Sequence, residues 1–425
     1  MSPPKKRTVM PASPAKSSRT TAPPCWIVAL SVFALTATLY SGLASWVGRT
    51  KSPTMAYYPA LAEAFLDGRL DLGNPEPRRD LTPYGGVWYL AFPPLPALIM
   101  MPEAWVRGSE GVNSVRYSVV FGAAAAAFVF LLLDALSRRG WTHLSLTDNL
   151  WLTGLFAFGS VALYMSLAGT VWLTSQVVAV AFIAAAAWLS VEAASPFMAG
   201  TALALALLAR SNLVLLWPLL LGLAVQRLRA DGRAGPGPAM AWAAGSLLPA
   251  LLAGTLLLGY NQARFDDPLD FGYATMNVSP DLSEGFQRYG QFDLAFLPRN
   301  LKWMLFGLPL WNEECGRWAP NPWGMSLLLT MPVVAFVYRA APRTPWRIGA
   351  WAAIGLTLPV LLLYHNTGYY QFGYRFSLDF LVPIIALLAA AGRDSLSPLF
   401  RALIATGIAI NFVGMAWFFE RWCVA

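Results

Sequence analysis

Several carboxylates lie in one loop, between the first two strongly apolar segments of the chain. Among them are Glu63, Asp67, Asp71, Glu76, Asp80 and Glu103. A carboxylate can take the proton from a hydroxyl nucleophile, or it can hold a divalent cation. Any one of them could instead be an ordinary solvent-exposed residue of a hydrated loop. As a set beside the aromatic and proline-rich stretches YGGVWY and FPPLP, they favour a site at a membrane face.

Two arginines lie next to or between apolar segments, where a charged side chain is costly in a membrane protein. Arg375 comes just before an apolar run, and an arginine next to a membrane span is costly unless it is paired or faces a cavity. Its guanidinium can hold a phosphate through two parallel hydrogen bonds, or it can form an ion pair with Asp379, one helical turn further on. Arg210 lies in a break between two short apolar runs. It could also bind phosphate, or it could snorkel from a helix end.

The composition indicates a chain that lies mostly in a membrane. Of its 425 residues, 57% are hydrophobic and 12% are charged, whereas an ordinary soluble domain carries about 25% charged residues. The formal net charge is +8, but the basic residues cluster in short loops and in the N-terminal tail, which argues against nucleic-acid binding. We expect a basic, disordered cytoplasmic tail over residues 1–23 and a single integral-membrane domain over residues 24–425.

The apolar segments predict an all-α polytopic fold with about eleven transmembrane helices. A bilayer-spanning helix needs about 20 apolar residues, and a charge-free stretch from 149 to 191 is long enough for two, with a turn near Gly169-Thr170. The other expected spans are 24–46, 115–136, 195–209, 212–228, 239–259, 323–339, 347–364, 376–393 and 400–419.

The placement of lysine and arginine sets the expected orientation. The basic tail and four basic loops fall on one side, taken as cytoplasmic, if the segment 88–105 does not cross the bilayer. That segment is short and rich in proline, which suits a re-entrant or surface-lying helix. The loops 47–114, 260–322 and 365–375 are then external, together with the C-terminus, and the first of them is large enough to bear short juxtamembrane helices.

Cysteine and histidine restrict the chemistry further. The chain has three cysteines and two histidines, and it contains no CxxC pattern, so a zinc site is not expected. Cys315 and Cys423 both fall on the expected external side, where they could form a disulfide or remain two unpaired thiols. The sequence contains no Walker A motif, so nothing points to ATP-driven transport.

Four stretches, in order along the chain, resemble the bacterial GT-C superfamily of multi-span glycosyltransferases, which is similar to the protein mannosyltransferases and the lipid A aminoarabinose transferase. The first stretch, in the 47–114 loop, reads AFLDGRLDL followed by DL-x-x-YGG-x-x-Y-x-x-FPPLPALIMMP. The others are ALALLARSNLVLLWPLLL (204–221), YNQARFDDPLDFGY (260–273) and YYQFGYRFSLDFLVP (369–383). The resemblance therefore extends over most of the chain.

The resemblance implies a polyprenyl-phosphate sugar as donor and a catalytic acidic residue in the first external loop. Carried over to this sequence, Asp80 is the first candidate and Asp71 the second, as general base or as ligand of a Mg²⁺ or Mn²⁺ ion. The implied acceptor is a cell-envelope glycan, lipid or protein at the outer face of the inner (cytoplasmic) membrane. The expected residues for donor and phosphate binding are Arg375, Arg210, Tyr84, Tyr89, Asn261, Arg264 and Asp379.

One departure from the family keeps other functions open. Many relatives carry an adjacent Asp-Glu pair directly after the first span, where this chain has Ala56-Tyr57-Tyr58. A non-catalytic membrane scaffold with the same fold is therefore one alternative. A transporter or flippase for a lipid-linked saccharide is another, although that function would need polar residues along a path through the membrane, and most charges here lie at loop ends.

Overall fold

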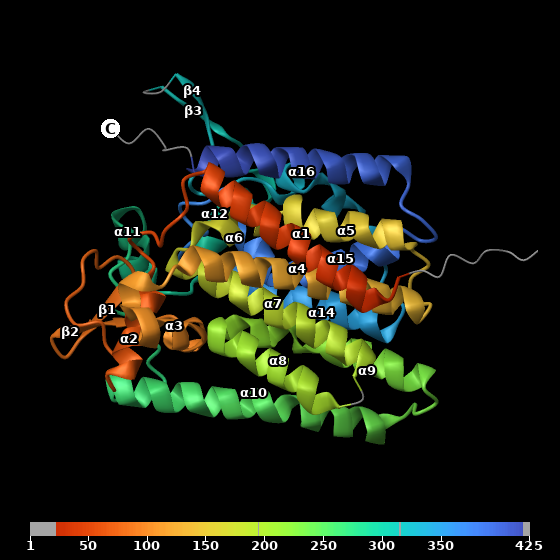
Figure 1. The fold of residues 1–425 in the computed structure, drawn as a ribbon, viewed down its shortest axis with the longest axis horizontal. Coiled ribbons are helices and arrows are strands. Elements are labelled where there is room, and N and C mark those ends of the chain that lie inside the picture. The colour runs from red at the N-terminus through yellow and green to blue at the C-terminus, as the bar shows by residue number, and fades with distance from the viewer. Residues whose placement is uncertain (1–22, 194, 314–315, 420–425) are drawn as a thin grey trace, which may run out of the picture.

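The computed structural model describes residues 23–193, 195–313 and 316–419, and it is mostly helical (Figure 1). The bundle consists of α1 (Cys25–Trp46), α4 (Ser114–Arg138), α5 (Leu146–Phe158), α6 (Ala162–Ala168), α7 (Val171–Glu192), α8 (Pro196–Ala209), α9 (Trp217–Ala230), α10 (Pro236–Phe265), α14 (Pro345–Leu363), α15 (Leu381–Ala391) and α16 (Pro398–Phe419). The shorter elements are α2 (Tyr57–Leu66), β1 (Leu81–Tyr84), β2 (Val87–Leu90), α3 (Leu95–Gly111), η1 (Ser211–Leu216), α11 (Pro280–Tyr289), η2 (Leu294–Phe296), α12 (Leu297–Phe306), β3 (Leu310–Asn312), β4 (Arg317–Ala319), α13 (Leu327–Thr330), η3 (Pro332–Arg339) and η4 (Arg375–Phe380).

Seven helices of the described residues are long and apolar enough to cross a membrane, and the number is eight if α5 and α6, which meet at 48°, form one bent span. The multi-pass helical fold is thus confirmed, but the expected count of eleven is not. Three apolar runs account for the difference. α8 has only 14 residues, the run 323–339 is split into α13 and η3, and the run 376–393 is split into η4 and α15. Each piece is shorter than the roughly 20 residues that a full span needs.

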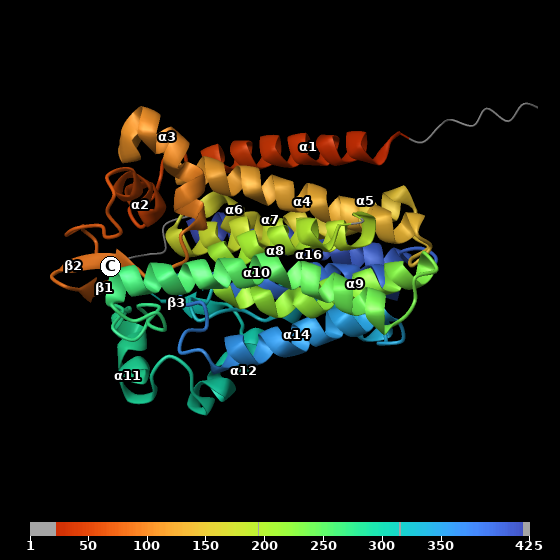
Figure 2. The same ribbon diagram turned by 90° about the horizontal axis from the view of Figure 1, so that it is seen from below.

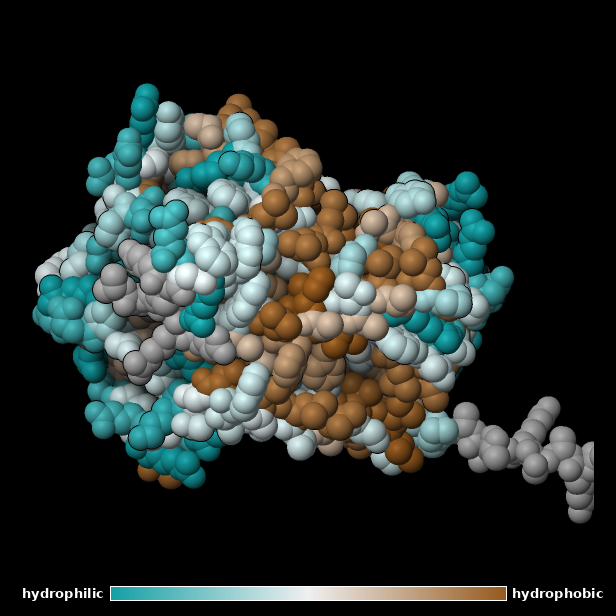
Figure 3. Space-filling view, turned by 90° about the horizontal axis from the view of Figure 1, so that it is seen from above, coloured by the Kyte–Doolittle hydropathy of each residue, from teal (hydrophilic) through white to brown (hydrophobic). Residues whose placement is uncertain are grey.

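The two ends of the bundle differ in character. Figure 1 places α2, β1, β2 and α11 together at one end, which we call the loop end. The opposite end carries the start of α1, the turn between α9 and α10, and the turn between α15 and α16. Figure 3 shows apolar side chains over the middle of the molecule, with hydrophilic side chains towards both ends. This banding is what a bilayer requires of the surface that it contacts.

Close approach of small residues holds the central helices together. Gly222 in α9 and Gly349 in α14 face one another, and a Cβ atom on Gly349 would lie 2.3 Å from the Pro218 carbonyl oxygen. α7 is buried on all sides, with fully covered alanines such as Ala184 and Ala187. Small residues let helix backbones pack closely in a membrane, where the hydrophobic effect does not favour association.

The first loop, 47–114, folds into a small unit with its own core at the loop end. Tyr58, Leu61 and Leu81 are fully buried there, and the start of α7 adds Val171 to the same cluster. α3 has Pro102 within it and a kink at Gly108, and it is not among the candidate spans. Figure 2 shows α2 and α3 standing off the end of the bundle, in line with the expectation that 88–105 does not cross the membrane.

Candidate functional site

Two adjoining cavities lie at the loop end. The larger has a volume of about 840 Å³ and the smaller about 300 Å³. Four residues line both of them and so mark the junction: Asp80, Trp172, Asn366 and Arg375. These residues come from the first loop, the start of α7 and the loop 365–375, and Phe271 from the loop 260–322 completes the smaller cavity. All three loops that the sequence grouped together therefore contribute to one site.

The backbone around Asp80 is fixed by the loop that follows α10. Asp80 has a left-handed conformation (φ 58°), which aspartate tolerates better than most residues. Its N–H donates to the Asn277 carbonyl oxygen (2.8 Å), and the Asn277 N–H donates to the Leu81 carbonyl oxygen (2.9 Å). The Asn277 side chain also donates to the Arg78 carbonyl oxygen (3.0 Å). The carboxylate is therefore held at a defined place rather than on a free loop.

The surroundings of Asp80 suit a proton acceptor. Burial raises the pKa of its carboxyl group to about 6, against the positive charges of Arg375 and Arg79 and the hydrogen bond from the Trp172 side chain, all of which favour the carboxylate. A carboxyl group with this pKa is mostly ionised at neutral pH, yet it is a stronger base than an ordinary aspartate.

We expect Trp172→Phe to shift the pH dependence of any reaction in which Asp80 is the base. Phenylalanine is also aromatic, but it lacks the indole N–H that stabilises the carboxylate, so the pKa of Asp80 rises above 6. Since the base acts when it is deprotonated, the rate rises with pH through this pKa, and the midpoint moves upward in the variant. A pH–rate profile of both proteins measures the shift, and superimposable profiles would contradict the role of Trp172.

Arg375 is buried, with 6% of its surface exposed, and its Nε atom has no hydrogen-bond partner. Its backbone N–H donates to the Gln371 side-chain oxygen (2.7 Å), and its side chain passes close to the backbone of Gly368, where a Cβ atom would lie 2.9 Å from Nε. No carboxylate of the described residues forms an ion pair with it. A buried guanidinium that lies over the Phe376 ring and has no carboxylate partner among the described residues, facing two cavities, is placed to bind an anion.

Asp379 does not pair with Arg375, contrary to one of the two sequence-based interpretations. Its carboxylate is fully buried and accepts from Arg210 Nε (2.8 and 2.9 Å), from Gln176 (2.9 Å) and from Asn212 (2.9 Å). Arg210 consequently does not snorkel either. It lines the smaller cavity, and its ion pair with Asp379 holds it in place.

Four other expected binding residues lie apart from the cavities and join the β1–β2 hairpin to α10. Tyr84 donates to Asp266 (2.9 Å), and Tyr89 packs edge-on against Phe265. Arg264 donates to the Leu90 carbonyl oxygen (2.7 Å) and to the Asn261 side chain (2.7 Å). None of the four predicted residues (Tyr84, Tyr89, Asn261 and Arg264) lines either cavity. In this structure they support the hairpin that carries Asp80.

Asp71 also lies outside both cavities. Its carboxylate accepts from the Gly73 N–H (2.8 Å) and lies 3.6 Å from Arg69, which are contacts of a turn. Of the two predicted carboxylates, only Asp80 shares a cavity with Arg375.

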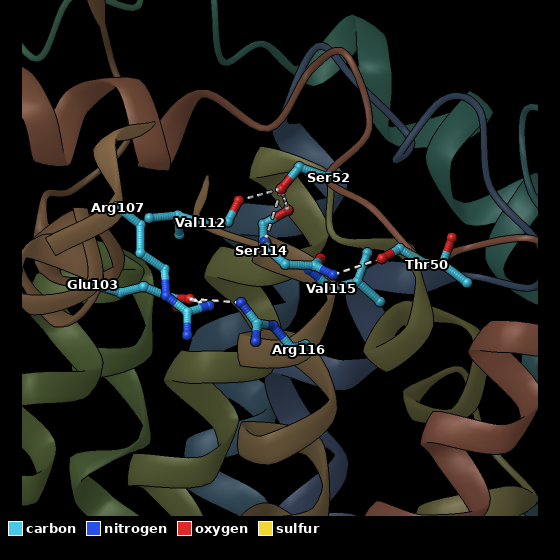
Figure 4. Close-up of polar contacts among 9 residues, drawn as sticks. Thr50, Ser52, Glu103, Arg107, Val112, Ser114, Val115 and Arg116 are labelled. Atoms are coloured by element: carbon cyan, nitrogen blue, oxygen red, sulfur yellow. Dashed lines mark hydrogen bonds and ion pairs between the residues drawn. The ribbon is translucent and has the colours of Figure 1, made fainter. Parts of the chain in front are cut away.

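A hydrogen-bonded junction fixes both ends of the first loop to the bundle (Figure 4). Ser52, just after α1, donates to the Val112 carbonyl oxygen (2.9 Å) and accepts from the Ser114 N–H at the start of α4 (2.9 Å). Close by, Glu103 of α3 accepts from Arg116 of α4 (2.6 Å). Glu103 is thereby occupied by an ion pair, which makes it a structural carboxylate of this loop.

Sequence reasoning did not single out three polar or aromatic residues that line the cavities: Arg49, Arg79 and Trp172. Asn366 accepts from the Gly368 N–H (2.8 Å) and the Tyr369 N–H (2.6 Å), which shapes the loop before Arg375. Arg79 precedes Asp80 directly, and Arg49 follows the first span. Their positions beside Asp80 and the first span could have indicated that they belong to the site.

The described residues do not fit a divalent cation at the site. They contain no group of three or more histidine, cysteine or acidic side chains close enough to share a metal ion. Asp80 is the one carboxylate that lines the larger cavity, and three arginines line it as well. Positive charge of that density opposes a Mg²⁺ or Mn²⁺ ion. Cys315 and Cys423, which could form a disulfide or remain two unpaired thiols, lie outside the described residues, as do residues 1–22 of the expected N-terminal tail.

Comparisons of the chain with protein-family models, with curated proteins and with solved structures find no match. The geometry of the site and the order of the four motifs along the chain are therefore the features that support a function.

Proposed function

We propose that this chain is a membrane glycosyltransferase with a GT-C-like fold, which moves a sugar from a polyprenyl-phosphate donor to a cell-envelope glycan, lipid or protein. The loop end would face the outside of the cytoplasmic membrane and the N-terminus would be inside. The basic residues support this orientation, because the turn between α9 and α10 and the turn between α15 and α16 lie at the opposite end.

The observation that carries the proposal is that Asp80 and Arg375 both lie at the junction of two cavities. Asp80 takes the proton of the acceptor hydroxyl as the oxygen of that hydroxyl attacks the anomeric carbon of the donor. A new carbon–oxygen bond forms, and the bond from the same carbon to the phosphate oxygen breaks. The electron pair of the broken bond stays on the phosphate, whose charge Arg375 stabilises, and the single displacement inverts the anomeric centre.

The smaller cavity has the surface that an isoprenoid donor would need. It is lined by aromatic and aliphatic side chains from the loops and from the end of α14: Phe92, Phe271, Tyr273, Met276, Phe292, Val360, Leu361, Tyr364 and Phe376. α14 is one of the candidate spans, so this lining continues from the membrane to Arg375. A lipid could therefore place its phosphate at Arg375 while its chain stays among apolar side chains.

The test uses the full chain in lipid nanodiscs with a panel of polyprenyl-phosphate sugars, and it follows release of the lipid phosphate. We expect Arg375→Ala to reduce release by about 10²-fold or more, because a charge that develops in a dry site loses its stabilising donor. Arg107→Ala is the matched control, since Arg107 is exposed and pairs only with Glu103. Tight donor binding without release in the wild type would favour a flippase or an inactive scaffold instead.

A further inference from the structure

We propose that the acceptor carries an anionic group, such as a phosphate, and that Arg49 and Arg79 select for it within the larger cavity. The inference rests on the proposed function and names the class of its second substrate. It starts from a charge imbalance, because three arginines line this cavity and Asp80 is its one carboxylate.

Arg375 alone accounts for the donor phosphate, so two of the three arginines, Arg49 and Arg79, remain for another ligand. Arg49 lies 5.1 Å above the Phe419 ring, and Arg79 is exposed beside Asp80. Neither forms an ion pair with a carboxylate of the described residues. Unpaired arginines in a concave site are suited to bind phosphate or carboxylate groups, and they favour anionic ligands over neutral ones.

The arginines are spread across the cavity rather than gathered at one point. Arg79 lies in the first loop, directly before Asp80, and Arg375 begins η4. Arg49 instead comes from the end of α1, near Tyr370 and Phe419. With the donor phosphate at Arg375, Arg49 remains for a second anionic group in the same cavity.

The different linings of the two cavities indicate that this second anionic group belongs to the acceptor. The smaller cavity is lined mostly by aromatic and aliphatic side chains and continues towards α14, which suits the donor lipid. The larger cavity has polar side chains such as Thr54, Thr170 and Tyr369 along its wall and a volume of about 840 Å³, enough for a sugar ring with charged substituents. The acceptor hydroxyl would meet Asp80 at the junction, with the anionic group held towards Arg49.

Binding tests the inference without turnover. Glucose and glucose 6-phosphate are titrated by calorimetry into the full chain in phosphatidylcholine nanodiscs. We expect the phosphate to increase affinity by about tenfold or more, and Arg49→Gln and Arg79→Gln each to remove most of that gain. Arg49→Lys, which keeps the charge, should retain part of it. Lys51→Gln is the matched control, because Lys51 carries the same charge two residues away and lines a different cavity.

Two further arms separate the sources of the phosphate and the two proposals. If phosphatidylglycerol in the nanodisc weakens binding of glucose 6-phosphate, the anionic group belongs to a lipid acceptor, and if it has no effect, the group belongs to a glycan. Equal affinity for glucose and glucose 6-phosphate, or an equal loss in Lys51→Gln, would overturn the inference. If the protein turns over a donor but does not prefer glucose 6-phosphate, the transferase proposal stands and the anionic-ligand inference fails. If it prefers glucose 6-phosphate but turns over no donor, the transferase proposal fails and the anion site remains.

Discussion

Replacing Asp80 with Asn is expected to lower turnover by about 10²–10⁴-fold, which is the usual contribution of a positioned general base. The amide has nearly the shape of the carboxylate, and asparagine also tolerates the left-handed backbone conformation at this position (φ 58°). The loss therefore reports on the proton acceptor rather than on the fold. Lipid-phosphate release in nanodiscs measures it, and binding of the donor should remain within a few fold of wild type.

Asp71→Asn is the matched control for this substitution. It makes the same chemical change in the same loop, but Asp71 is engaged with Gly73 and Arg69 and lies outside both cavities. We expect near-normal turnover. If Asp71→Asn abolished release and Asp80→Asn did not, the base would have been assigned to the wrong carboxylate, and the cavities described here would not be the reaction site.

The presence of Asp80 and Arg375 in one site could be anticipated because it depends on topology more than on detailed packing. Lysine and arginine placement put the loops 47–114, 260–322 and 365–375 on one side. Each contains a motif rich in residues that can bind or transfer groups, so residues almost 300 positions apart were expected to meet. The cavities confirm that the three loops come together, and they narrow two candidate carboxylates to the one that faces Arg375.

The partners of buried charges could not be anticipated in the same way. The spacing of Arg375 and Asp379 is that of neighbours on a helix, yet the segment is a 3-10 helix and Asp379 bonds with residues that precede it by more than 160 positions. The break after α8 brings Arg210 and Asn212 to Asp379. The sequence around these residues does not indicate that contact. The span count was wrong for a related reason, because apolar composition does not show where a helix is interrupted.

Arg210→Ala is expected to reduce the free energy of unfolding by about 3–5 kcal/mol, the usual cost of leaving one member of a buried ion pair without its partner. Asp379 is 1% exposed at its side chain and keeps only the two neutral donors Gln176 and Asn212 in the variant. Unfolding of purified protein in mixed micelles by increasing SDS measures the change. Arg138→Ala is the control, since Arg138 is half-exposed and its ion pairs with Asp134 and Glu192 are worth about 0–1 kcal/mol each.

The double variant Arg210→Met with Asp379→Leu separates structure from function. Because it removes both charges and retains side-chain volume, it should recover part of the stability that Arg210→Ala loses. Arg210 also lines the smaller cavity, so donor binding should remain weakened in the double variant even where stability returns. If stability and donor binding recovered together, Arg210 would act only through the fold. If Arg210→Ala weakened donor binding without any loss of stability, the pair with Asp379 would not be the structural anchor that its geometry indicates.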